Sequence, residues 1–186
     1  MTSIPSGTEA TQSAATRPRP RFERILAYRW LLTLGAGVLL LDRVSKAWIC
    51  ARLPYPTYGY PGHRVVIEGF FNLVNVGNTG AAWSLFSGRS TILALLAVAT
   101  LIAIYAWRHQ LGLRTRIVQI SFGLLCGGIL GNLLDRLLHG HVIDFLDFHF
   151  GSYIYPTFNV ADSGICVGVA IYLLYSLCQP DSPNKP

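Results

Sequence analysis

The fold is decided by the stretch Gly127-Gly128-Ile129-Leu130-Gly131-Asn132-Leu133-Leu134-Asp135-Arg136, which Val142-Ile143-Asp144-Phe145 follows closely. An apolar segment here ends in an amide, a carboxylate and a guanidinium, and another carboxylate comes nine residues after the first. Charged groups beside lipid are costly, so a membrane protein that keeps them usually uses them. The stretch therefore predicts a membrane protein whose polar residues serve a functional site.

The composition also indicates a membrane protein. The chain has 186 residues, of which 52% are hydrophobic and 13% are charged, whereas a soluble domain carries about a quarter charged residues. The formal net charge of +6 would suit a nucleic-acid partner. However, the basic residues cluster at the ends of apolar segments, where they set membrane topology, and not on one basic face. We therefore expect no nucleic acid as a partner.

Four apolar segments are long enough to cross a bilayer: residues 28–49, 90–107, 117–134 and 159–178. They predict an all-α integral membrane protein with four transmembrane helices. Basic residues precede the first segment and separate the second from the third, and basic flanks stay in the cytoplasm. We therefore expect both termini to be cytoplasmic.

The chain divides into one membrane domain, residues 25–179, and two tails. Residues 1–24 are rich in Ser, Thr, Pro and Arg and cannot build a core, so they are predicted to be a disordered cytoplasmic tail. Residues 180–186 form a short polar tail on the same side. The single Met at position 1 is not followed by the early apolar run and small-residue cleavage site of a secretory signal.

Residues 51–89, between the first two predicted helices, have a different character. Several Pro and Gly residues break helices there, and residues 64–67 and 70–76 have the composition of short strands. We predict a small extracytoplasmic β-sheet that covers the membrane end as a platform or lid. Residues 137–157, after the third helix, are predicted to be a loop or a stretch that lies in the membrane interface.

The predicted topology brings five of the nine acidic residues close to one level in the outer leaflet: Asp42, Asp135, Asp144, Asp147 and Asp162. Asp42 and Lys46 are four residues apart, so they share one helix face and can pair. Two interpretations of this pair are equally good. It could be an interfacial pair that reaches toward the headgroups, or it could face a site inside the outer leaflet.

Asp144 and Asp162 are the pair that we favour for chemistry. Two close carboxylates share one proton, so one can take a proton from water while the other polarises a scissile amide. Asp144 stands among hydrophobic residues, and Asp162 shares a helix face with Asn159 at the start of the last helix. The competing interpretation for Asp162 is a helix N-cap. Asp147 fits a solvated loop acid.

Other sites are less well supported by the residues. His139, His141 and His149 could bind a metal together with Asp144, but their spacing is loose and a surface role is favoured. The four cysteines are expected to pack as small hydrophobic residues. We expect no metal and no other cofactor. The alternatives to a peptidase are a small transporter or channel lined by intramembrane acids, a metal-dependent membrane hydrolase, and a non-enzymatic assembly protein.

Several short blocks of sequence together resemble a known family. Each block is weak evidence alone, but their occurrence in this order is specific. They are Asp42-Arg43-Val44-Ser45-Lys46, Asn78-Thr79-Gly80-Ala81-Ala82-Trp83, Gly127 to Arg136, Val142-Ile143-Asp144-Phe145 and Phe158-Asn159-Val160-Ala161-Asp162. With four predicted helices, the chain resembles the lipoprotein signal peptidases, or signal peptidase II, of bacterial inner membranes. It departs from the usual family pattern at Trp83, where Phe is common, and at Ser45, where Thr is common.

The resemblance implies a membrane aspartic endopeptidase that cuts before the lipidated cysteine of a diacylglyceryl-modified prolipoprotein. Asp144 and Asp162 would be its catalytic pair. Family positions that line or shape the site match Asp42, Lys46, Asn78, Gly80, Asn132, Asp135, Arg136 and Asn159. The implied partners are the prolipoprotein, membrane lipids and the inhibitor globomycin, and we expect a monomer in the inner membrane with its active site near the outer leaflet.

Overall fold

A computed structural model describes residues 21–57, 62–81 and 85–179. Its elements follow one another in the order α1 (Arg21–Leu26), α2 (Arg29–Arg52), β1 (Arg64–Ile67), β2 (Phe71–Asn78), α3 (Ser90–Ala106), α4 (Arg116–His139), β3 (Val142–Phe150), β4 (Tyr153–Ile154) and α5 (Val160–Leu177). Residues 1–20 and 180–186, which make up most of the two predicted tails, lie outside the described residues, whereas residues 21–24 belong to α1.

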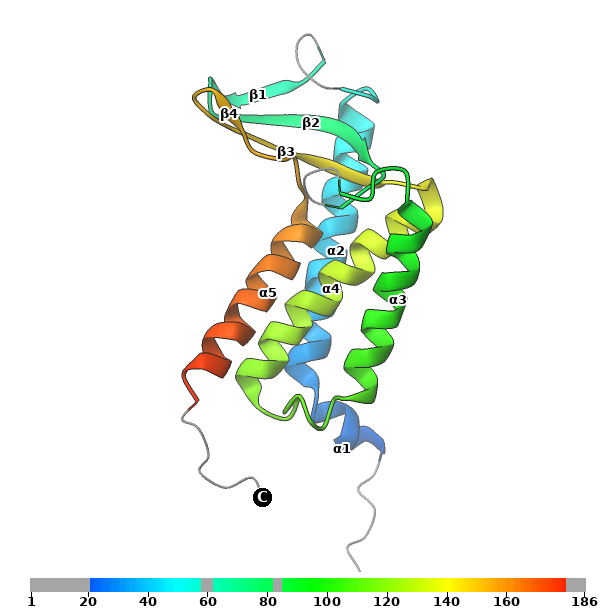
Figure 1. Cartoon of the computed structure of the whole chain (residues 1–186), viewed down its shortest axis with the longest axis vertical. Helices are drawn as coiled ribbons and strands as arrows, with labels where there is room; N and C mark the ends of the chain where they lie inside the picture. The colour runs from blue at the N-terminus through cyan, green and yellow to red at the C-terminus, as the bar shows by residue number, and fades with distance from the viewer. Residues whose placement is uncertain (1–20, 58–61, 82–84, 180–186) are drawn as a thin grey trace, which may run out of the picture.

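Four long helices form a bundle, with a β-sheet across one end and α1 at the other (Figure 1). Helix α4 is central, because it packs against α2, α3 and α5. The chain runs alternately up and down the bundle, so α1 and the last turn of α5 lie at the same end (Figure 1). We call the two ends of the bundle the sheet end and the α1 end.

Glycines allow α4 to approach its neighbours closely. A Cβ atom on Gly127 would lie 2.5 Å from the backbone oxygen of Gly35 in α2. On the opposite side, a Cβ on Gly128 would collide with the backbone oxygen of Ala161 in α5. Gly131 leaves room for the carboxylate of Asp42, which would be 2.6 Å from such a Cβ. The close packing expected from this small-residue pattern is therefore confirmed.

Helix α5 has the reverse of the side-chain arrangement found in a soluble protein. Its buried residues are the small ones Ala161, Gly164 and Gly168, whereas Leu173 and Leu174 are 54% and 63% exposed. In water this outward apolar face would be costly, but lipid tails are as apolar as leucine and impose no such cost. Helix α5 is therefore built to present its large side chains to lipid.

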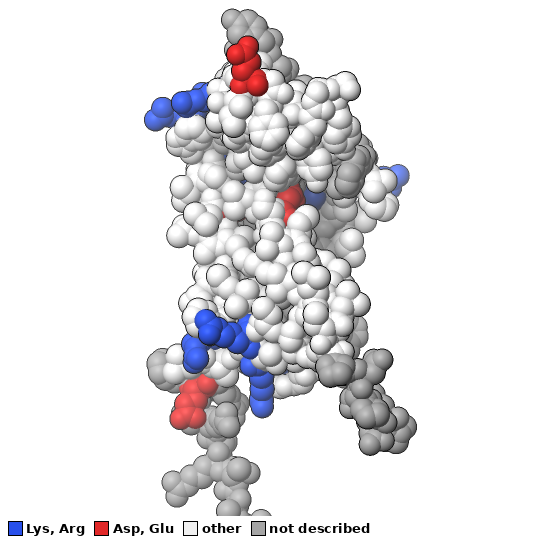
Figure 2. Space-filling view, turned by 90° about the vertical axis from the view of Figure 1, so that its left-hand side faces the viewer, with Lys and Arg blue, Asp and Glu red and all other residues white. Residues whose placement is uncertain are grey.

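Two described helices, α4 and α5, are long and apolar enough to cross a membrane by length and composition. Helix α3 has 17 residues and is apolar throughout, and α2 is interrupted by Asp42, Arg43 and Lys46. On the face in Figure 2, basic side chains gather near the two ends, and a largely uncharged band lies between them. This pattern fits a chain embedded in a bilayer.

The sheet has four antiparallel strands in the order β1-β2-β3-β4. The strand predicted at 64–67 is confirmed, and the one predicted at 70–76 begins one residue later and continues to Asn78. The prediction of a loop over 137–157 is wrong, because that segment contains the end of α4 and both β3 and β4. β3 pairs with the edge of β2. The segment 142–150 is therefore a strand because of a partner that is distant in sequence.

Two predicted helices are longer in the structure. The first, predicted to end at residue 49, continues to Arg52, and the third, predicted over 117–134, continues to His139. Asp135 and Arg136 consequently lie inside α4 and not at its end. The helix continues through them because both make contacts within the protein, and it ends at Gly140, whose φ of 74° is left-handed.

Candidate active site

Asp144 is held inside the protein by strand β3, and its side chain is 2% exposed. Its two oxygens accept hydrogen bonds from the amide of Asn159 (Nδ2 to Oδ1, 2.7 Å) and that of Asn78 (Nδ2 to Oδ2, 3.0 Å). Burial and, to a smaller extent, the negative charge of Asp162 raise the pKa of Asp144 to about 7, against the lowering effects of the two amides and Lys46. A proton is therefore available on this carboxyl near neutral pH.

Asp162 stands in the first turn of α5, and its side chain is half-buried. Asn159, not Asp162, is the N-cap: its side chain accepts from the backbone N–H of Asp162, and Asp162 accepts from the backbone N–H of Asn159. The competing interpretation of Asp162 as the N-cap is therefore wrong. It is the third residue of the helix in a capping box, where a carboxylate is favoured. Its other oxygen accepts from Nδ2 of Asn132 at 2.7 Å.

Asn159 connects the two carboxylates. Its side-chain amide nitrogen donates to the carboxylate of Asp144, and its backbone N–H donates to the carboxylate of Asp162. Its side-chain oxygen accepts from the backbone N–H of Asp162. It is fully buried, and it also contacts the side-chain oxygen of Asn132 at 3.2 Å. Two carboxylates that are 18 positions apart in the sequence thus lie on either side of a single asparagine.

A network of buried charges lies beneath this pair at the sheet end. The ammonium of Lys46 donates to Asp42 (2.9 Å), Asp135 (2.7 Å) and Asn132 (3.2 Å). These three contacts use all three of its protons. Lys46 is 2% exposed and both acids are fully buried, so the Asp42–Lys46 pair faces the interior of the protein, and the interpretation in which it reaches toward the headgroups is wrong.

Arg43 belongs to the same network, although sequence reasoning gave it no role. Its Nη2 lies 2.9 Å from Asp42 and 2.5 Å from Asp135. Two cations thus balance two acids, and we call Asp42, Arg43, Lys46 and Asp135 the ionic quartet. Arg43 follows Asp42 directly, and adjacent helix side chains diverge, so nothing local signalled that it would reach a carboxylate 92 residues away.

The ionic quartet also fixes the two elements that carry the candidate catalytic acids. Asp42 accepts a hydrogen bond from the backbone N–H of Ala161 (3.1 Å), at the start of α5. Asp135 accepts one from the backbone N–H of Ile143 (3.1 Å), directly before Asp144. Since Lys46 joins both acids, one buried ammonium sets the position of α5 relative to β3.

Arg136 and Gly80 complete the site along its edge. Arg136 donates to the backbone oxygen of Gly80 at 3.0 Å, and Gly80 in turn donates to the side chain of Asn78 at 2.9 Å. A Cβ on Gly80 would lie 2.7 Å from the backbone oxygen of Leu85, so only glycine fits there. Trp83 lies outside the described residues.

Asp147 is buried, contrary to the expectation of a solvated loop acid. Its side chain accepts from Asn72 (3.3 Å) and contacts His149 (2.7 Å), because β3 points it to the opposite face of the sheet from Asp144. His141 stacks on Tyr55. In the described parts of the chain, no three His, Cys, Asp or Glu side chains come together in a way that could hold a metal ion.

The structure therefore brings together ten residues from α2, the segment 78–80, α4, β3 and the start of α5. Of the predicted set, all ten meet in one connected network: Asp42, Lys46, Asn78, Gly80, Asn132, Asp135, Arg136, Asn159 and the pair Asp144 and Asp162. Among the described residues, the buried acids and the buried lysine gather at the sheet end and are not spread through the bundle, as a transport path for ions would require. Two carboxylates of unequal burial, framed by amide donors, suit hydrolysis of an amide by activated water.

Comparison with known proteins agrees with this chemistry. A family model described as signal peptidase (SPase) II matches residues 34–178. A lipoprotein signal peptidase of Nitratidesulfovibrio vulgaris (strain DP4) is 40% identical over 167 residues, covering 86% of this chain and 98% of that protein. One of Oleidesulfovibrio alaskensis is 43% identical over 156 residues, covering 81% and 92%.

The fold is also similar to that of solved proteins. A bacterial membrane enzyme determined by the in meso method at 2.3 Å resolution matches with a TM-score of 0.72 and 29% identity, covering 83% of this chain and 94% of the solved one. A second, at 1.9 Å resolution, matches with a TM-score of 0.67 and 31% identity over 81% and 94% of the two chains.

Proposed function

The chain belongs to the signal peptidase II family, and from this premise we propose that Asp144 and Asp162 are the catalytic pair of a membrane aspartic endopeptidase. Membership makes the protein a protease that removes signal peptides in lipoprotein processing. The proposal assigns that reaction to two residues. The observation that carries it is Asn159, which bonds to both carboxylates and keeps them at one site.

In the proposed mechanism, the two carboxyl groups share one proton. The ionised carboxylate takes a proton from a water molecule, whose oxygen attacks the carbonyl carbon of the scissile amide. The protonated carboxyl group donates to the carbonyl oxygen, and a proton then passes to the leaving nitrogen as the C–N bond breaks. Two new chain ends result, and no covalent enzyme intermediate is required.

The remaining site residues position this pair. Asn78 and Asn159 orient the carboxylate of Asp144, and Asn132 orients that of Asp162. Arg136 lies close enough to both acids for their charges to interact with its own, and it fixes the segment at Gly80. Lys46 and its acids support the framework behind them.

We further propose that α2, α3, α4 and α5 all cross the bacterial inner membrane, with both termini in the cytoplasm. The large exposed apolar residues on α3 and α5 support this orientation, as do the basic residues at the α1 end. The sheet end then lies at the outer leaflet. There the acyl chains of a diacylglyceryl-modified prolipoprotein would reside in the bilayer while the bond before its lipidated cysteine meets the two acids.

The same proposal implies that membrane lipids surround the enzyme, that a globomycin-type cyclic peptide blocks the Asp144–Asp162 pair, and that one chain suffices for activity. Inhibition by globomycin of the purified protein and its mass in detergent test these two points directly.

The decisive experiment is a gel-shift assay of prolipoprotein cleavage by the variants Asp144→Asn and Asp162→Asn. Asparagine keeps the shape of each side chain but cannot exchange the proton. We expect each variant to lose at least ~10³-fold in rate, since residues that act as a unit fail together. Normal protein yield with the parent rate in either variant contradicts the assignment.

Asp147→Asn is the matched control, because it makes the same chemical change three residues away on the same strand but on the other face of the sheet. We expect it to keep most of the activity. A loss as large as that of Asp144→Asn would mean that the assay reports damage to the sheet and not loss of the catalytic proton. A metal chelator is added in a separate reaction, and loss of activity there would favour the metal-dependent alternative.

A further inference from the structure

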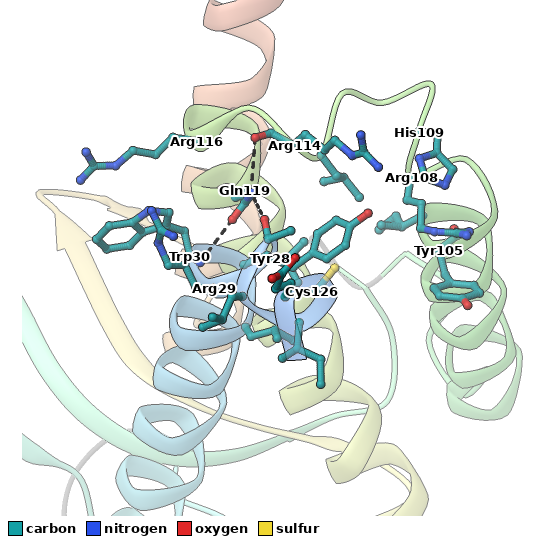
Figure 3. Close-up of a pocket in the computed structure, with 18 of the residues that line it drawn as sticks. Tyr28, Arg29, Trp30, Tyr105, Arg108, His109, Arg114, Arg116, Gln119 and Cys126 are labelled. Atoms are coloured by element: carbon teal, nitrogen blue, oxygen red, sulfur yellow. Dashed lines mark hydrogen bonds between the residues drawn. The ribbon is translucent and has the colours of Figure 1, made fainter. Parts of the chain in front are cut away.

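A large cavity lies at the α1 end of the bundle, far from the catalytic acids. It has a volume of about 1140 Å³, is partly open to the surface, and is lined by α1, the start of α2, the last turns of α3, the loop after α3 and the first half of α4 (Figure 3). Sites for drug-sized ligands occupy roughly 300–1,000 Å³. The cavity therefore has room for a ligand larger than a small metabolite.

Its polar lining is strongly basic. Arg29, Arg108, Arg114 and Arg116 contribute to it, against the single acid Glu23 among the lining residues. In the part of the chain that the structure describes, every ion pair of an arginine or lysine belongs to the ionic quartet, so these four arginines face no carboxylate within 4.0 Å. Their charge is available to an external anion.

Two of these arginines lie over aromatic rings. The guanidinium of Arg116 lies 4.4 Å from the ring centroid of Trp30, and that of Arg108 lies 4.5 Å from that of Tyr105. Stacking fixes the guanidinium plane and leaves N–H groups at its edge, which suits the oxygens of a phosphate. The aromatic rings and arginines together resemble the belt found where a membrane protein meets lipid headgroups.

Much of the rest of the lining is apolar and comes from α1, α2 and α3. It includes Ile25, Leu26, Leu32, Leu101 and Ile104. Ile25 and Leu32 are 58% and 49% exposed, so the apolar wall continues to the outer surface of the bundle. A ligand for this cavity therefore needs an anionic head and hydrocarbon chains.

The floor of the cavity is already ordered. Gln119 is 4% exposed, and its side chain donates to the backbone oxygen of Ala27 (2.7 Å) and accepts from the backbone N–H of Trp30 (3.3 Å), as the dashed lines in Figure 3 show. These bonds tie the α1–α2 junction to α4. Binding then requires little reorganisation of the protein.

Charge decides between the candidate occupants. The preceding residues 1–20 contain Arg17 and Arg19 and one acid, Glu9, so they would be repelled by a basic cavity. A second copy would present the same basic face. We propose that the cavity binds an anionic phospholipid, with its phosphate on the arginines and its acyl chains along the apolar wall. Clusters of arginine at the cytoplasmic end of membrane helices suit such headgroups.

The test uses the full-length protein in detergent, stripped of lipid and then given equal amounts of phosphatidylglycerol and phosphatidylcholine with identical acyl chains. Native mass spectrometry counts the lipids retained. We expect the parent protein to retain phosphatidylglycerol at least about tenfold better. Each arginine near a lipid surface contributes roughly fivefold in binding, so Arg114→Gln combined with Arg116→Gln should weaken phosphatidylglycerol binding roughly 25-fold.

The matched control combines Arg52→Gln with Arg64→Gln, which removes two exposed charges outside the cavity. It should retain phosphatidylglycerol as the parent does. An equal loss in this control would show general attraction to charge and overturn the proposal. So would equal retention of the two lipids by the parent, displacement of the lipid by millimolar inorganic phosphate, or a lipid-free dimer in the spectrum, which would assign the cavity to a second copy.

Discussion

The two ends of the bundle use positive charge in opposite ways. At the sheet end, Arg43 and Lys46 are enclosed with Asp42 and Asp135, and each cation contacts both acids. At the α1 end, the arginines that surround the cavity have no such partners among the described residues. We call the ionic quartet a closed network, because its charges are paired within the protein, and the cavity arginines an open one. A closed network fixes positions within the protein, whereas an open one remains available to a ligand.

The largest effect is expected from removing Lys46, the central cation of the ionic quartet. Lys46→Met would leave Asp42 and Asp135 buried with one cation between them. Breaking a buried ion pair costs about 3–5 kcal/mol, so we expect a large fall in the free energy of unfolding in detergent and loss of cleavage. The control is Arg52→Met on the exposed end of the same helix, for which unchanged unfolding is expected. Equal effects of the two changes would contradict a closed network.

The packing of the sheet end can be tested through Gly128. In Gly128→Ala, the new methyl group meets the backbone oxygen of Ala161 at the start of α5. Overpacking of this kind costs about 1–3 kcal/mol, and it would displace the helix that carries Asp162. Thermal unfolding and cleavage rate should both fall.

Gly37→Ala is the matched control for that change, because nothing lies within 4 Å of a Cβ at Gly37 in α2. It should be neutral or stabilise the helix by up to about 1 kcal/mol. If Gly128→Ala behaved like Gly37→Ala, α4 and α5 would not pack as closely as described.

The dependence of the rate on pH tests whether burial at the sheet end keeps a proton on the proposed catalytic pair. Because burial raises the pKa of Asp144 to about 7, the proton is present below that pH and is lost as the pH rises through it. Cleavage needs one proton on the pair, so the rate should fall up to about tenfold per pH unit above 7. Unfolding curves at pH 7 and 9 check that the enzyme stays folded. A constant rate up to pH 9 would refute this account.

The smallest expected effect is at the open end. Arg116→Gln removes an exposed guanidinium that stacks on Trp30, and surface changes of this kind alter stability by no more than about 0.5 kcal/mol. The free energy of unfolding in lipid-free detergent should therefore change little. A loss of several kcal/mol would mean that this arginine has a hidden partner and belongs to a closed network as well.

The parts of the fold that were predicted from the sequence depend on local patterns. The apolar periods of the helices, the strand at 64–67 and the Asp42–Lys46 pair all follow from neighbours within a few positions. The candidate residues were recognisable because the blocks that contain them resemble a known family. Their assembly around Asn159 and Lys46 required the tertiary structure.

The features that the sequence did not reveal depend on distant partners. Asp144 and Asp147 interrupt the apolar run of β3, and that segment becomes a strand by pairing with β2, which is distant in sequence, and with β4. Arg43 finds Asp135 across 92 positions. The cavity at the α1 end draws its walls from four separate elements, and no single segment carries its pattern.

The position of the capping asparagine also has a consequence for biosynthesis. A nascent chain that has been made as far as His139 already contains all four members of the ionic quartet, but neither proposed catalytic acid. Asp144 arrives with β3, and its partner arrives only with Asn159 and the first turn of α5. On the proposed assignment, the catalytic pair is therefore incomplete throughout synthesis until the first turn of α5 has been made.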